Sequence, residues 1–98
     1  MRTLLAIALL ALASPALHAA DVMKGGNLYR MHCAACHGAN GIAVMPTAPS
    51  FQRGERLMQP DMMLLQSVKT GKNAMPGFIG ILTDRDILDV VAFLRTIR

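Results

Sequence analysis

The chain has 98 residues and a formal net charge of +4 at pH 7, a length that leaves room for one domain. With no basic run, three phenylalanines, one tyrosine and no tryptophan, it lacks the means to stack and neutralise a nucleic acid, so we expect no nucleic-acid partner. A domain this small buries little surface, and such domains usually gain stability from a metal, a disulfide or a cofactor.

Residues 1–20 have the features of a secretory signal peptide. Arg2 supplies a positive charge, residues 4–12 form an unbroken apolar run, and small residues follow. We predict cleavage after Ala19 or Ala20. Because the apolar run is shorter than the roughly 20 residues that span a bilayer, the mature chain is expected to have no membrane span and to reach the periplasm, an oxidising compartment.

The mature chain, residues 21–98, is expected to form one domain. Residues 22–35 have helical character, and three of their apolar residues are spaced to share a face: Leu28, Met31 and Ala35. The next segment, residues 38–59, contains several glycines and prolines and no sustained period, which predicts an irregular loop with at most a short turn.

Two more helices are predicted after this loop. One begins near Pro60 and ends at Gly71, and residues 73–81 form another loop. Thr83 and Asp86 have the spacing of a capping box, which starts the last helix. That helix carries an apolar stripe of Ile87, Val90, Val91, Leu94 and Ile97. No strand alternation is visible, so the expected fold class is all-α, with three to four helices and long loops.

The segment Cys33-Ala34-Ala35-Cys36-His37 carries the clearest chemical signal. Two thiols one helical turn apart can add to the two vinyl groups of a haem, and the adjacent imidazole then reaches the iron. A disulfide here would close a very small ring, and a thioredoxin-like pair would need a βαβ pattern that is absent. A zinc site would need more ligands than His32 can add, and we interpret His32 as a surface or packing residue rather than a ligand. The motif predicts one covalent haem c.

A second iron ligand is predicted from position. Of the seven methionines after the leader, Met75 stands out because it precedes Pro76 in a short loop between two predicted helices. Proline restricts its own backbone and biases the residue before it toward extended geometry, which limits where the thioether can point. Met75 can therefore project toward the open face of a plane held at residues 33–37, while the other methionines are interpreted as packing.

Taken together, these residues resemble the class I c-type cytochromes, particularly the small bacterial type with a single haem. Gly25 and Tyr29 match the family's glycine and aromatic residue before the first cysteine, and Phe93 matches its aromatic residue on the last helix. The resemblance implies that the first and last helices cross at these residues. It also implies the small cytochrome c fold, in which helices and long loops wrap around one haem.

Two loops extend the resemblance. Residues 71–78 are similar to the family's distal loop, with Met75 in the place of the axial methionine. Residues 48–51 resemble the segment whose proline carbonyl orients the haem-ligating histidine, a role for which Pro49 is the first choice and Pro46 the second. The site residues implied are Cys33 and Cys36 for attachment, with His37 and Met75 on the iron.

The resemblance implies a monomeric carrier of single electrons and not an enzyme, because two axial ligands leave no position for substrate. Its donor would be a bc1-type complex or a quinol dehydrogenase, and its acceptor a terminal reductase or oxidase. Lysines that could steer an acidic partner are Lys24, Lys69 and Lys72, although we favour solvated surface charges. The alternatives are an accessory cytochrome of a denitrification (nitrite reductase) system, and a haem sensor or enzyme with a labile sixth ligand.

Overall fold

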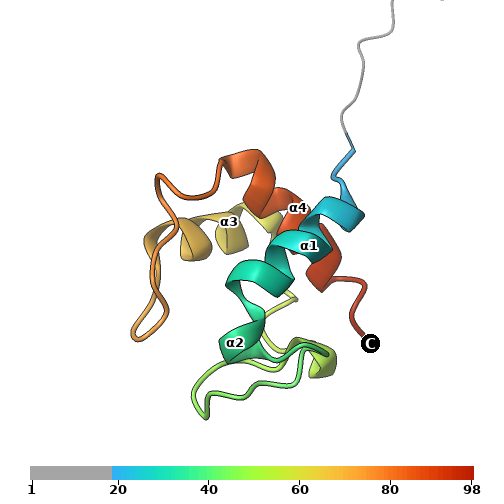
Figure 1. The fold of residues 1–98 in the computed structure, drawn as a ribbon, viewed down its shortest axis with the longest axis vertical. Helices are drawn as coiled ribbons and strands as arrows, with labels where there is room; N and C mark the ends of the chain where they lie inside the picture. The colour runs from blue at the N-terminus through green and yellow to red at the C-terminus, as the bar shows by residue number, and fades with distance from the viewer. Residues whose placement is uncertain (1–18) are drawn as a thin grey trace, which may run out of the picture.

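The computed structural model describes residues 19–98, which contain four α-helices; only Cys33 separates the first two, and long loops join the others (Figure 1). The helices are α1 (Val22–His32), α2 (Ala34–His37), α3 (Asp61–Thr70) and α4 (Asp84–Leu94). One turn of 3₁₀ helix, Phe51–Arg53, interrupts the loop between α2 and α3. Extended pairing within this part of the chain is limited to an isolated bridge between Lys72 and Met75. The expected all-α class is confirmed.

The predicted leader, residues 1–20, lies outside the described residues except for its last two, Ala19 and Ala20, which are exposed. From residue 19 onward, none of the helices combines the length and the apolar character that crossing a bilayer requires.

The helices α1 and α4 cross in close contact (Figure 1). A Cβ added at Gly25 would lie 1.9 Å from the carbonyl oxygen of Asp89, and one at Gly26 would lie 3.1 Å from the Phe93 ring. Tyr29 is fully buried, and its ring centroid is 5.3 Å from that of Phe93. Glycine lets the two backbones approach, and the aromatic pair fills the space beside them. The predicted crossing is confirmed.

The packed face of α1 differs from the predicted one. Leu28 is partly buried against the core, but Met31 is 73% exposed and Ala35 is exposed. The buried residues of α1 are instead Gly25, Gly26 and Tyr29. The expected apolar face is wrong because close approach of two helix backbones selects residues without side chains, and a period read from hydropathy does not register glycine.

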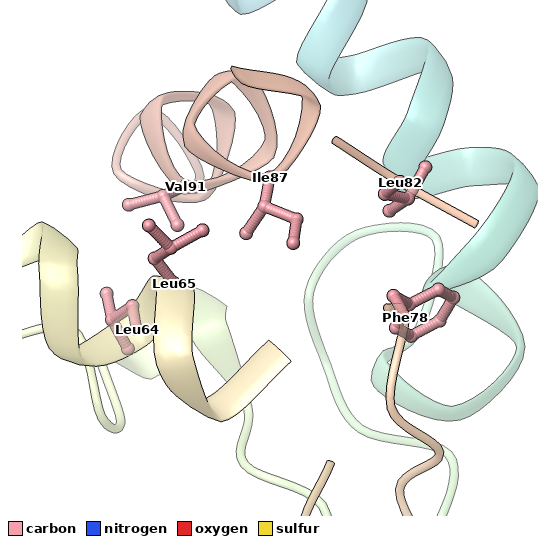
Figure 2. Close-up of a cluster of buried hydrophobic side chains, with 6 residues drawn as sticks. All are labelled: Leu64, Leu65, Phe78, Leu82, Ile87 and Val91. Carbon is pink, nitrogen blue, oxygen red and sulfur yellow. The ribbon is translucent and has the colours of Figure 1, made fainter. Parts of the chain in front are cut away.

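The hydrophobic core has two parts, both built around α4. Figure 2 shows the first, in which Leu64 and Leu65 of α3 face Ile87 and Val91 of α4. The loop before α4 adds Phe78 and Leu82 to this part. The second part joins α1, the 3₁₀ turn and α4 through Tyr29, Phe51, Val90 and Leu94. The predicted stripe of α4 is thus confirmed, with Ile97 packing just beyond the end of the helix.

The ends of α3 and α4 follow the predicted local signals. Pro60 lies immediately before the first residue of α3. Gly71, with φ +76°, ends the helix. At the start of α4, Thr83 Oγ1 accepts a hydrogen bond from the Asp86 amide at 3.1 Å, and Asp86 Oδ2 accepts one from the Thr83 amide at 3.0 Å. The Lys24 ammonium beside it, together with the Thr83 amide, holds the pKa of Asp86 below its usual value.

Candidate functional site

The cysteine motif lies at the junction of α1 and α2. Cys33 ends α1, its amide donating to the Tyr29 carbonyl at 2.8 Å, and α2 begins at the next residue. The Cys36 amide donates to the Cys33 carbonyl at 3.2 Å, so the two cysteines lie within one helical turn. Gly38, with φ +85°, ends α2, and a Cβ there would lie 1.8 Å from the Ile42 carbonyl oxygen. The chain therefore turns sharply immediately after His37.

Both cysteines carry free thiols, so the disulfide alternative is not supported. Cys36 is exposed, whereas burial, with a smaller contribution from Cys36, raises the pKa of the Cys33 thiol to about 11. Residues 19–98 contain no group of three or more histidine, cysteine, aspartate or glutamate side chains placed to hold a metal ion.

The His37 imidazole is held in one orientation. It is 7% exposed and stacks on Phe51, with ring centroids 4.6 Å apart and an interplanar angle of 28°. Its Nδ1 lies 3.2 Å from the carbonyl oxygen of Pro49. A proton on Nδ1 satisfies that carbonyl and leaves Nε2 as the nitrogen with a free lone pair. The proline that contacts the histidine is therefore Pro49 and not Pro46, which is exposed.

Two residues that sequence reasoning missed fix the position of Pro49. Ser50 is 1% exposed, and its Oγ accepts a hydrogen bond from the Ala43 amide at 2.9 Å. The Ser50 amide donates to Glu55 Oε1 at 2.7 Å. These bonds tie residues across an irregular loop, and no periodic pattern signals them. A serine directly after the matched proline was the only local hint available.

Tyr29 connects the helix crossing to the motif. Its hydroxyl donates a hydrogen bond to the carbonyl oxygen of Gly38, the residue that ends α2. Burial, with a smaller contribution from Cys33, raises the pKa of Tyr29 to about 12. The hydroxyl therefore stays protonated and remains a donor over the physiological range.

Met75 sits in a tight turn that is fastened to α3. Its amide donates to the Lys72 carbonyl at 2.9 Å, and the Lys72 amide donates back to the Met75 carbonyl at 3.0 Å. Gly71 at the base of the turn has no room for a Cβ, which would lie 2.6 Å from the Met75 carbonyl oxygen. The Met75 side chain is partly buried and packs against the α3 and α4 part of the core. The turn thus has a defined shape.

The same loop also contacts the helix that carries the motif. The Phe78 amide donates to the carbonyl oxygens of Val68 and Lys69, both at 3.1 Å, which docks the loop on α3. The Phe78 ring meets the His32 ring edge-on, with centroids 5.8 Å apart. Of the two roles predicted for His32, surface or packing, this contact shows packing, and it links the end of α1 to the loop that contains Met75.

The residues present fit a covalently attached haem. Two free thiols one turn apart and an imidazole whose Nδ1 faces a carbonyl oxygen are the donors that such a group requires. Residues 19–98 also leave several large apolar side chains exposed: Ile42, Val44, Met62, Met63, Ile79 and Ile81. A groove of about 600 Å³ beside α3 includes Met62 and Met63 and continues to Lys72, at the start of the Met75 turn. An apolar cofactor would cover surface that this small core does not.

Two of the three lysines considered as partner contacts are held in ion pairs. Lys24 Nζ lies 2.9 Å from Asp86 Oδ1, and Lys69 Nζ lies 3.1 Å from Asp84 Oδ1. These pairs tie α1 and α3 to the start of α4. Such lysines fit the favoured interpretation as surface charges better than a steering ring around a cofactor edge.

Comparison with known proteins identifies the family. Residues 20–94 match the family model described as cytochrome C oxidase, cbb3-type, subunit III. The cytochrome c6 of Thermosynechococcus vestitus is 43% identical over 94 residues, covering 92% of this chain and 82% of the relative. The cytochrome c6 of Nostoc sp. is 38% identical over 95 residues, covering 93% and 85%.

Solved structures agree with the sequence relatives. Cytochrome c6 from the diatom Phaeodactylum tricornutum superposes with a TM-score of 0.64 at 33% identity, covering 76% of this chain and 90% of that one. The c-type cytochrome KustC0563 gives a TM-score of 0.68 at 25% identity, covering 76% and 96%. The chain therefore belongs to the cytochrome c family, as a small monohaem c-type cytochrome that binds one covalent haem c and carries electrons rather than acting as an enzyme.

Proposed function

We propose that this protein is a periplasmic carrier of single electrons between respiratory redox partners, with its haem attached at Cys33 and Cys36 and ligated by His37 and Met75. The observation that carries the proposal is the orientation of His37. Its ring directly follows the second cysteine, is buried, and has Nδ1 against the Pro49 carbonyl. An axial imidazole needs this arrangement, because a partner on one ring nitrogen fixes the tautomer that presents the other to the metal.

Each residue of the site has a distinct task. When bound, the haem supplies a reversible one-electron couple at its iron. Cys33 and Cys36 would attach it to α2, and His37, the next residue in the chain, would supply an imidazole to its iron. Met75 would supply a thioether as the second iron ligand, which would raise the reduction potential relative to a second imidazole. With both ligands bound, the iron would have no position for a substrate, and the group would serve as an electron carrier.

The location and the partners are proposed from the leader segment and from the family match. The apolar segment within residues 1–20 favours a cleaved leader, with processing after Ala19 or Ala20 and a monomeric mature chain in the periplasm. A bc1-type complex or a quinol dehydrogenase would donate electrons, and a terminal reductase or oxidase would accept them. The matched family model, described as an oxidase subunit, supports an oxidase among these. No observation on the described residues favours the accessory role in denitrification or the sensor.

Covalent attachment through these two thiols is tested by extraction. Acid and acetone remove a haem held only by its axial ligands, whereas thioether bonds survive, so the wild-type protein should keep its colour. The double variant Cys33→Ala, Cys36→Ala should lose all acid-stable haem. Met23→Ala, at a side chain that is 82% exposed, is the matched control and should retain it. A double variant that still holds acid-stable haem would place the attachment elsewhere.

A further inference from the structure

One peptide group links His37 to a carboxylate. The carbonyl oxygen of Pro49 lies 3.2 Å from His37 Nδ1, and the amide of the same peptide unit, Ser50 N, donates to Glu55 Oε1 at 2.7 Å. Carboxylate, peptide and imidazole are therefore connected in series. We propose that Glu55 is a positioning residue for the proximal ligand: through the Pro49–Ser50 peptide it strengthens the acceptor that faces Nδ1 and so makes His37 a stronger electron donor to iron.

The physical basis is polarisation along a chain of hydrogen bonds. A charged acceptor on an amide N–H makes a bond about twice as strong as a neutral acceptor does. Electron density drawn toward that amide's own carbonyl makes the oxygen a better acceptor, and bonds in such chains strengthen one another by roughly 10–30%. A stronger acceptor on the outer nitrogen of a ligating histidine raises the basicity of the nitrogen that binds the metal. More basic ligation favours the ferric state, and hence a lower reduction potential.

The surroundings make this link effective. Ser50 is 1% exposed and His37 is 7% exposed, so water does not screen the middle of the chain. The Ser50 side chain also receives Arg53 Nη2 at 3.2 Å, in addition to the Ala43 amide, which prevents the peptide from rotating. The chain reverses at Gly54, with φ +77°, and this turn brings Glu55 back to the Ser50 amide.

Two simpler explanations compete with this proposal. Glu55 could act on the iron only as a charge through space, and its side chain is 47% exposed, so water and salt would screen such an effect. It could also be a purely structural bond of the loop, since its other oxygen lies 3.8 Å from Arg53 Nε. The first explanation predicts that the negative charge at residue 55 affects the reduction potential whether or not the carboxylate accepts the hydrogen bond from the Ser50 amide. The second predicts lost stability without any change at the imidazole.

The proposal rests on His37 being an iron ligand, as proposed above, and the test uses the haem-loaded protein. The variants are Glu55→Gln, which keeps an oxygen acceptor but removes the charge, and Glu55→Asp, which keeps the charge on a shorter arm. Asp84→Asn is the control, because it removes a charge at an exposed carboxylate that is paired with Lys69. Three quantities are measured: the reduction potential, the proton resonance of His37 Nδ1–H in the ferrous state, and the midpoint of denaturant unfolding.

We expect Glu55→Gln and Glu55→Asp both to raise the reduction potential and to move the Nδ1–H resonance upfield, as a weakened hydrogen bond requires, while Asp84→Asn changes neither. The proposal is overturned if Glu55→Asp keeps wild-type values while Glu55→Gln does not, since charge alone would then act. It is equally overturned if only the unfolding midpoint changes. In both cases, a haem spectrum of the variants that matches wild type shows that His37 still ligates the iron, so the proposed function stands. If the spectrum of the wild-type protein itself shows no histidine ligation, both proposals are overturned.

Discussion

Replacing Met75 by alanine is expected to open the iron and lower the reduction potential. A thioether bound to ferric iron gives a weak absorption band near the red end of the visible spectrum, and Met75→Ala should abolish it. Loss of the thioether should lower the potential by on the order of 0.1 V, a part of the ~0.8 V range that axial ligands span. The ferrous variant should also bind carbon monoxide. Absorption spectra and a redox titration of the purified protein measure all three effects.

The matched control is Met58→Ala, at a methionine that is 97% exposed. This variant should keep the red band and the wild-type potential, because Met58 lies outside the turn formed by Lys72 and Met75. If Met75→Ala retained the band and substitution of another methionine abolished it, Met75 would not be the second iron ligand.

Gly25→Ala is expected to destabilise the fold by about 3 kcal/mol, the upper end of the cost of overpacking a tight contact. The added methyl group would lie 1.9 Å from the Asp89 carbonyl oxygen and 2.4 Å from its carbon, both backbone atoms of α4. Neither can move without separating α1 from α4. Because alanine is intrinsically the better helix former by about 1 kcal/mol, a loss of stability could only come from the crossing. Urea unfolding followed by circular dichroism measures it.

Gly26→Ala provides the control in the same helix. Its methyl group would meet the Phe93 ring at 3.1 Å, and a side chain can shift by a few tenths of an ångström where a backbone cannot. We therefore expect a change within about 1 kcal/mol of wild type, since helix propensity offsets the contact. Equal stability of Gly25→Ala and wild type would mean that the two helices do not pack as described.

The predictable parts of this protein are those encoded locally. The capping box at Thr83 and Asp86 and the helix stop at Gly71 each act within a few residues, and α4 begins and α3 ends where these signals predict. The haem motif at residues 33–37 is also local, but the single helix predicted over residues 22–35 is divided at Cys33 into α1 and α2. Resemblance to the family left two candidates, Pro46 and Pro49, for the proline whose carbonyl contacts His37. Choosing Pro49 required the distance from its carbonyl to the imidazole.

The unpredictable parts depend on contacts between distant segments. Nothing local marks Glu55 as the partner of the Ser50 amide, because the loop between them has no period. The buried carboxylate of Asp89 is similar: it is 2% exposed and accepts a hydrogen bond from the Asp21 amide, 68 residues earlier, at 2.8 Å. A charged residue on a helix is usually predicted to lie at the surface, and Asp89 is buried only because the start of α1 packs against it.

Carbon monoxide binding by the reduced wild-type protein at neutral pH tests the carrier assignment most directly. If His37 and Met75 both ligate the iron, no axial position is free, and adding carbon monoxide should leave the ferrous spectrum unchanged on the timescale of mixing. Rapid formation of a carbon monoxide complex would show that the sixth position is open or labile. Transfer of electrons by a closed haem would then lose its basis, and a sensor or an enzyme would explain the site better.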